Sequence, residues 1–182
     1  MASINGNNGE RFNKGDYVTS QSMNGRVARI EKFIVEKDRP NDPRAVVIPT
    51  FAHGGTAKTL PVDFLDHVVK GGKPNKYGYV NHKDGRSNLK FDKESKNIII
   101  ENRQKYIQNR KELISKYLGK SVSFQFPADS WGNKTKTVYA KVLDVEPDHG
   151  GMLSGSKLYL KVRAKDGSIY TPTSDKIRIV KL

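Results

Sequence analysis

Two short runs of this chain predict its architecture: Lys14-Gly15-Asp16-Tyr17-Val18 and Gly25-Arg26-Val27-Ala28-Arg29-Ile30. Each run places a glycine directly before a short segment of β character. Glycine suits the corner of a strongly bent sheet, because it tolerates a positive φ and the close approach of another backbone. Together the two runs predict a hairpin that begins a small sheet.

The spacing of these residues resembles the KOW motif, which is the first hairpin of an SH3-like barrel in ribosomal proteins and transcription elongation factors. The matching residues are Gly15, Asp16, Val18, Gly25, Val27 and Ile30. This resemblance covers about the first third of the chain and implies an SH3-like barrel there. Modules of the family mostly bind nucleic acid and some bind proteins, so it also implies one of these two kinds of partner.

The C-terminal third repeats the pattern. Gly119-Lys120-Ser121-Val122 is similar to Gly15-Asp16-Tyr17-Val18, and Asp166-Gly167 predicts a hairpin turn. The two segments also end alike, because Pro61 stands eight residues before Val69 and Pro172 stands eight residues before Val180. These matches predict an internal repeat of two barrels, and the alternative is coincidence between two basic β sequences.

Between the two barrels, the sequence predicts a linker that contains one helix. An apolar stripe with helical spacing runs from Tyr106 to Tyr117, and Gly119 is suited to end the helix. Asn102 could cap the start, or Asp92 could cap a longer helix, whereas the three isoleucines 98–100 favour a strand instead. Arg103 and Arg110 lie inside the stripe, so their stems are expected to pack while their charged ends reach water.

The sequence therefore predicts a mainly β protein of two small SH3-like barrels of the KOW or Tudor type, joined by a basic linker with one helix. The expected parts are a disordered tail at 1–10, an N-terminal KOW-like SH3-like barrel at 11–70, a basic linker with the helix at 71–118 and a C-terminal SH3-like barrel at 119–182. The polar N-terminus has no apolar signal core, and no apolar run is long enough for a membrane span, so a cytoplasmic location is expected.

Charge points to the class of partner. The chain has a net charge of +14, which favours a polyanionic partner such as nucleic acid. Residues 1–69 hold 9 Lys and Arg against 8 Asp and Glu, residues 70–118 hold 13 against 5, and residues 119–182 hold 11 against 6. The net charges are thus +1, +8 and +5, so a composite surface of linker, helix and second barrel is expected to bind.

The candidate nucleic-acid-binding residues form three groups. Loop cations neutralise phosphates, and aromatic rings beside them can stack on exposed bases. The linker group is Lys73, Lys76, Tyr77, Tyr79, His82, Lys83, Arg86 and Lys90; the hairpin group is Arg26, Arg29 and Lys32; Lys134 and Lys136 lie in the second barrel. The alternative is a solvated linker whose tyrosines pack on a barrel.

Catalysis is not expected. The four histidines lack metal-ligand spacing, there is no cysteine, and neither the P-loop nor the nucleophile-elbow motif is present. We therefore expect no enzyme activity, no cofactor and no metal.

The predicted function is binding of double-stranded DNA with little sequence preference. Overall architecture and charge are also similar to a family of early transcription modulators of T4-type phages. That resemblance implies a protein that alters transcription in the infected bacterium, at the host nucleoid and alongside host nucleoid or transcription proteins. The alternatives are RNA binding, as in ribosomal or elongation-factor KOW modules, and a protein-interaction module that docks on a host factor.

Overall fold

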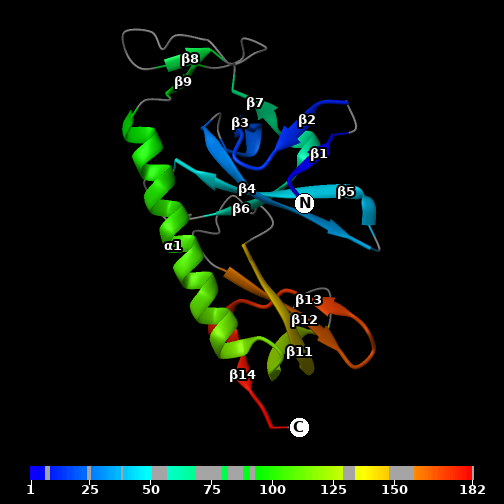
Figure 1. Ribbon diagram of the computed structural model, residues 1–182. Helices are drawn as coiled ribbons and strands as arrows, with labels where there is room; N and C mark the ends of the chain where they lie inside the picture. Colours follow the sequence, from blue (N-terminus) through cyan, green and yellow to red (C-terminus); the bar gives the residue numbers. More distant parts are fainter. Residues whose placement is uncertain are drawn as a thin grey trace. The chain divides into compact units, whose positions relative to one another are not determined.

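The computed structural model describes residues 1–6, 9–23, 26–37, 39–50, 57–68, 79–81, 88–90, 93–128, 134–147 and 158–181 (Figure 1). Over these residues the fold is mainly β, with two five-stranded sheets, two two-stranded sheets and one α-helix. The chain divides into two compact units. Unit 1 comprises Met1–Tyr106, and unit 2 comprises Ile107–Pro147 together with the chain from residue 158 onward.

Unit 1 is built on a five-stranded antiparallel sheet with the strand order β6-β5-β4-β3-β7. Its strands are β3 (Tyr17–Thr19), β4 (Ala28–Glu36), β5 (Arg39–Pro49), β6 (Lys58–Pro61) and β7 (Asp66–His67). Short 3₁₀ helices occupy Gln21–Met23 and Val62–Phe64, the second directly before β7. Residues such as Val18, Ile30 and Leu65 pack into one buried apolar cluster.

The stretch at residues 37–44 contains two prolines, but β5 already begins within it, at Arg39. Pro40 and Pro43 lie between Arg39 and Arg44, which both pair with β4, and the register with β4 is irregular there. Proline cannot donate a backbone hydrogen bond, so an irregular stretch of ladder is where a strand accommodates it.

The N-terminal tail expected at residues 1–10 is not wholly disordered. β1 (Ser3–Asn5) pairs with β2 (Arg11–Asn13), and Ile4 lies opposite Phe12. Phe12 is fully buried in the core of unit 1, and Ile4 packs against that core. The burial of these two side chains orders a segment that polar composition alone predicted to be free.

Unit 2 contains a second five-stranded antiparallel sheet, with the strand order β13-β12-β11-β10-β14. Its strands are β10 (Ser121–Pro127), β11 (Thr135–Pro147), β12 (Leu158–Ala164), β13 (Ile169–Tyr170) and β14 (Arg178–Ile179). A 3₁₀ helix at Ser174–Lys176 comes before β14. Gly167 has a φ of +86° in the turn between β12 and β13, as the Asp-Gly pair predicts.

The two sheets have the same topology, and individual backbone hydrogen bonds of one sheet have an equivalent in the other. In each, the last strand follows a 3₁₀ helix and pairs with the first strand. The Val68 N–H donates to the Tyr17 carbonyl, and the Val180 N–H donates to the Ser121 carbonyl. Val68 therefore corresponds to Val180, one residue earlier than the predicted alignment of Val69 with Val180; Val69 itself lies outside the described residues.

Gly15 and Gly119 occupy equivalent corners. Their φ angles are +96° and +72°, in the left-handed region that glycine adopts without strain. The Gly15 N–H donates to the Ile30 carbonyl, and the Gly119 N–H donates to the Val142 carbonyl. A register shift follows each acceptor directly, between Ile30 and Lys32 in β4 and between Val142 and Asp144 in β11.

The helix α1 (Lys93–Tyr117) takes the longer of the two predicted forms. It includes the three isoleucines 98–100, and Asp92, the cap expected for it, lies just outside the described residues. Ile99, Tyr106 and Tyr117 are buried, as expected for the apolar stripe, whereas Ile107 is exposed. The stripe also contains the buried polar residue Asn102, whose Nδ2 donates to the Pro49 carbonyl at 2.8 Å.

The charged ends of the α1 arginines form ion pairs, whereas the sequence predicted that they reach water. In unit 1, Arg103 donates through Nε to Glu31 at 2.6 Å and through Nη2 at 3.0 Å. In unit 2, Arg110 donates through Nη2 to Asp144 at 2.6 Å and through Nε to the Val145 carbonyl at 3.1 Å. Both acids adjoin the register shift of their strand, where a side chain can meet the helix.

We predict that Arg103→Ala lowers the free energy of unfolding by roughly 2 kcal/mol, because the Glu31 carboxylate loses two charge-assisted hydrogen bonds. Glu31 is largely buried, with only 10% of its side chain exposed, so water cannot replace these bonds fully. Urea unfolding followed by circular dichroism measures the change. Lys105→Ala is the matched control on the exposed side of α1; an equal loss in both variants would contradict the prediction.

Candidate nucleic-acid interface

Most of the predicted linker group lies outside the described residues: Lys73, Lys76, Tyr77, His82, Lys83 and Arg86. Tyr79 and Lys90 lie in the short strands β8 (Tyr79–Asn81) and β9 (Asn88–Lys90), which pair with each other. Tyr79 is directly opposite Lys90 in this register. The segment predicted as a linker therefore contains a pair of antiparallel strands. Tyr79 and Lys90 lie together at one end of this pair.

In the hairpin group, Arg29 is held by contacts within unit 1. It lies in β4, opposite Tyr17 of β3 and Ile48 of β5. Its guanidinium lies 3.9 Å from a Glu31 carboxylate oxygen and passes over Gly15, close to where a Cβ would stand. Glu31 therefore binds Arg103 closely and lies near Arg29 as well.

The other two hairpin cations differ in exposure. Arg26 is exposed ahead of β4, and Lys32 is half-buried within β4. The register shift between Ile30 and Lys32 separates Lys32 from the regular part of the ladder. The three cations of this group therefore do not share one environment.

Lys134 and Lys136 are exposed near the start of β11. Lys136 lies opposite Phe126 of β10, whose ring contacts Tyr170 edge-on at 4.8 Å between centroids. The Ser168 backbone N–H lowers the pKa of Asp166 most strongly, and the charge of Lys136 lowers it further. Lys136 therefore lies close enough to Asp166, an acid of the same unit, for their charges to interact.

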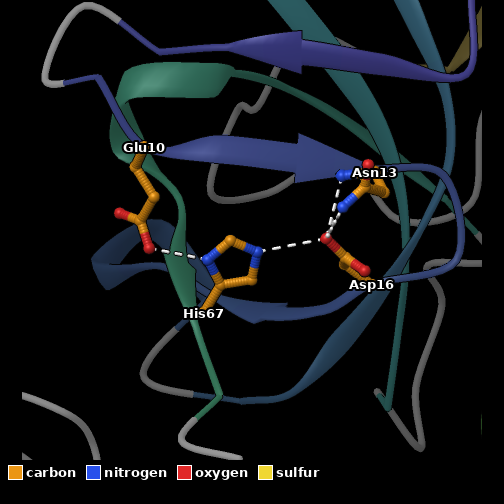
Figure 2. Close-up of polar contacts among 4 residues, drawn as sticks. All are labelled: Glu10, Asn13, Asp16 and His67. Atoms are coloured by element: carbon orange, nitrogen blue, oxygen red, sulfur yellow. Dashed lines mark hydrogen bonds and ion pairs between the residues drawn. The ribbon is translucent and has the colours of Figure 1, made fainter.

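A polar cluster that the sequence did not predict lies in unit 1 (Figure 2). His67, in β7, lies between two carboxylates: Nδ1 is 2.6 Å from Glu10 Oε1, and Nε2 is 3.1 Å from Asp16 Oδ2. Asp16 also accepts from the Asn13 backbone N–H at 2.8 Å and from Asn13 Nδ2 at 3.3 Å. The imidazole ring stacks on Phe12, with 4.5 Å between the ring centroids.

The cluster connects segments far apart in the chain. Glu10 and Asp16 are 57 and 51 residues from His67, so no local spacing could have revealed it. Ionised carboxylates only accept hydrogen bonds, so His67 can donate to both acids only as the imidazolium. Both ring nitrogens thus contact carboxylates and the ring face contacts Phe12. The cluster therefore connects β7 to the residues on either side of β2.

The electrostatic state of Asp16 follows from its neighbours. Burial raises the pKa of the Asp16 carboxyl, but the hydrogen bonds from the Asn13 backbone and from His67 lower it more, so the net shift is below the ordinary value of 3.8. Asp16 is therefore ionised at neutral pH and favours the folded chain in that form.

The described residues lack two features. They contain no group of three His, Cys, Asp or Glu side chains that could hold a metal ion. Within the same part of the chain, no helix has the length and hydropathy required to cross a membrane.

We predict that Asp16→Asn lowers the free energy of unfolding by roughly 1 kcal/mol at neutral pH, because an ionised hydrogen-bond acceptor is lost. The folded-state pKa of Asp16 is depressed, so this contribution is complete well above pH 3.8 and disappears as the pH falls through the lower folded-state value. The difference between wild type and variant should therefore shrink below pH 3.8. Chemical unfolding across that range measures it, with the exposed-residue variant Glu101→Gln as control; a difference independent of pH would contradict the assignment.

Comparison with known proteins adds no argument about function. No family model matches the chain, and no curated protein matches it. Among solved structures, it is similar to a selenium-substituted double mutant of the SAWADEE domain of SHH1 from Arabidopsis thaliana, at 8% sequence identity and over 92% of this chain and 98% of that one. The TM-score of that match is 0.26.

Proposed function

We propose that this protein binds double-stranded DNA through the phosphate backbone, with little preference for base sequence. The observation that carries the proposal is the distribution of charge. Residues 70–118 have a net charge of +8 and residues 119–182 a net charge of +5, whereas residues 1–69 have only +1. A concentrated excess of cations attracts a polyanion and releases its counterions on binding.

The side chains of α1 support the proposal. Its two arginines are directed at acids of the sheets, as described above, but its five lysines are exposed: Lys93, Lys96, Lys105, Lys111 and Lys116. The arginines thus hold the helix in place, while the lysines contribute to the field in solvent. Lysine is a flexible point charge, which suits contacts with phosphate more than the reading of base edges.

Sequence-tolerant binding is proposed because both arginines of α1 are bound to acids of the sheets and are not available to read bases. Base edges in the major groove are read by arginine, asparagine and glutamine in bidentate geometry. Asn102 is buried against the Pro49 carbonyl, and Arg103 and Arg110 are bound to acids. These side chains are therefore committed to the fold.

The role in transcription is proposed from the sequence resemblance. Architecture and charge resemble those of MotB, the early transcription modulator of T4-type phages, and the N-terminal motif resembles KOW modules. We accordingly propose that each five-stranded sheet closes into an SH3-like barrel and that the protein acts on DNA in a bacterial nucleoid, with no catalytic step of its own. RNA binding and docking on a host protein remain outcomes of the tests.

The test is a titration of the full chain with fluorescent duplexes at several salt concentrations. We predict that duplexes of unrelated sequence bind within roughly tenfold of one another, as phosphate-dominated binding requires. Affinity should fall steeply as salt rises. A structured RNA of equal length and a pull-down with and without nuclease are the comparisons. Tighter binding to RNA, a strong preference for one short sequence, or capture of a protein after nuclease treatment would each overturn the proposal.

A second prediction compares the two main groups of candidate cations. Replacement of Lys73, Lys76, Lys83 and Arg86 by alanine should weaken DNA binding and reduce the salt slope by up to about one unit per lost contact. The matched change at Arg26, Arg29 and Lys32 should do less, because residues 1–69 have a net charge of +1 and Arg29 is paired with Glu31.

Circular dichroism shows whether both variants are folded. A larger loss of affinity in the hairpin variant would show that the KOW-like hairpin is the main contact, contrary to the charge argument.

A further inference from the structure

We propose that the outer face of the sheet in unit 2 is a phosphate-binding surface built around Lys141 and Arg163. This inference rests on the proposed DNA binding and names a contact site for it. We call the site the cationic face; it consists of Lys141, Arg163, Arg178 and Tyr139. None of these residues belongs to the three groups predicted from the sequence.

The register of the sheet places the two central cations directly opposite each other. Lys141 of β11 pairs with Arg163 of β12, and both side chains are exposed. Their neighbours Ala140, Val142 and Val162 are buried. Because successive side chains in a strand point to opposite faces, Lys141 and Arg163 project from the face away from the core.

The same face continues over the neighbouring strands. Tyr139 lies two residues before Lys141 and is 48% exposed. It pairs with Ser123 of β10, which in turn pairs with Arg178 of β14. Residues directly opposite each other in antiparallel strands share a face, so Arg178 is on the same side as Tyr139 and Lys141.

Two like charges directly opposite each other in a sheet are destabilising. Within the described residues, neither Lys141 nor Arg163 forms an ion pair through its side chain. The acid that follows along β11, Asp144, lies beyond the register shift and is bound by Arg110. The repulsion is therefore left without a compensating acid in this part of the structure, and an anion between the two cations would relieve it.

Unit 1 provides an internal comparison. Since Ile30 corresponds to Val142, the position of Lys141 is occupied in unit 1 by Arg29, and that of Arg163 by Ile48. Arg29 therefore has no cation opposite it in β5, unlike Lys141 in β11. Its guanidinium also lies 3.9 Å from a carboxylate oxygen of Glu31. The residue corresponding to Glu31 in unit 2 is Leu143. Within the described residues, the shared scaffold thus presents a cation beside an acid in unit 1 and two opposed cations without an ion pair in unit 2.

The chemistry of the face fits the phosphodiester backbone of DNA. Strands about 4.8 Å apart with side chains about 6.6 Å apart along each strand place its cations within reach of neighbouring phosphates. The Tyr139 hydroxyl and the serines between the cations can donate to phosphate oxygens. A β surface with one sign of charge can contact a phosphate backbone without reading base edges.

The test is Arg163→Glu in the full chain, titrated with a fluorescent duplex at several salt concentrations. The substitution removes one cation and places an acid opposite Lys141. We expect an affinity loss of about tenfold and a salt slope lower by about two units, because two phosphate contacts are lost. Thermal unfolding should occur at the same or a higher temperature, since the opposed charges then attract each other.

The matched control is the double variant Lys14→Gln and Lys37→Gln, which changes the net charge by the same two units at exposed positions of unit 1. We expect it to keep its affinity within about twofold at moderate salt, because these lysines are outside the proposed contact. Equal losses in both variants would overturn the site but leave DNA binding intact. Absence of duplex binding by the wild-type chain would overturn the proposed function and this inference with it.

Discussion

The backbone hydrogen bond from the glycine at each sheet corner is the contact on which the rest of the architecture depends. Gly15 and Gly119 donate from a left-handed conformation to Ile30 and Val142, and the long strand changes register directly after each acceptor. This irregularity bends the strand and exposes a different set of side chains beyond it. The same event in both units decides which charges face the helix and which face solvent.

The helix is attached to the sheets by polar contacts in addition to its buried apolar side chains. Asn102 and Arg103 bind a carbonyl and a carboxylate in unit 1, and Arg110 binds both kinds of group in unit 2. The hydrogen bond to Glu31 raises the pKa of the Arg103 guanidinium further. Polar partners of this kind require one geometry, so they specify how the helix seats on each sheet.

The duplicated scaffold carries two different charge patterns. In unit 1, acids hold the cations in place: Glu31 binds Arg103 and approaches Arg29, and Glu10 and Asp16 enclose His67. In unit 2, the equivalent face carries Lys141 opposite Arg163. Under the proposed function, this contrast gives unit 2 a phosphate contact that unit 1 lacks, because the corresponding cation of unit 1 lies beside an acid.

Sequence by itself determined the features that rest on local chemistry. The glycine corners, the repeated β pattern, the Asp-Gly turn and the presence of a central helix all follow from conformational preference and periodicity within a few residues. The uneven distribution of charge along the chain was equally visible. What remained open locally, such as the start of α1, was decided by the burial of Ile99 together with Asn102.

Only the tertiary structure decided the contacts between distant residues. The ordering of Ser3–Asn5 depends on Phe12 in the core. The polar cluster at His67 joins residues more than 50 positions apart. The arginines of α1 form ion pairs with acids of the sheets. The opposition of Lys141 and Arg163 likewise arises from a register that includes a bulge. The physical reason is common to all: strand pairing and ion pairing join residues far apart in the chain, and composition and local spacing do not encode such contacts.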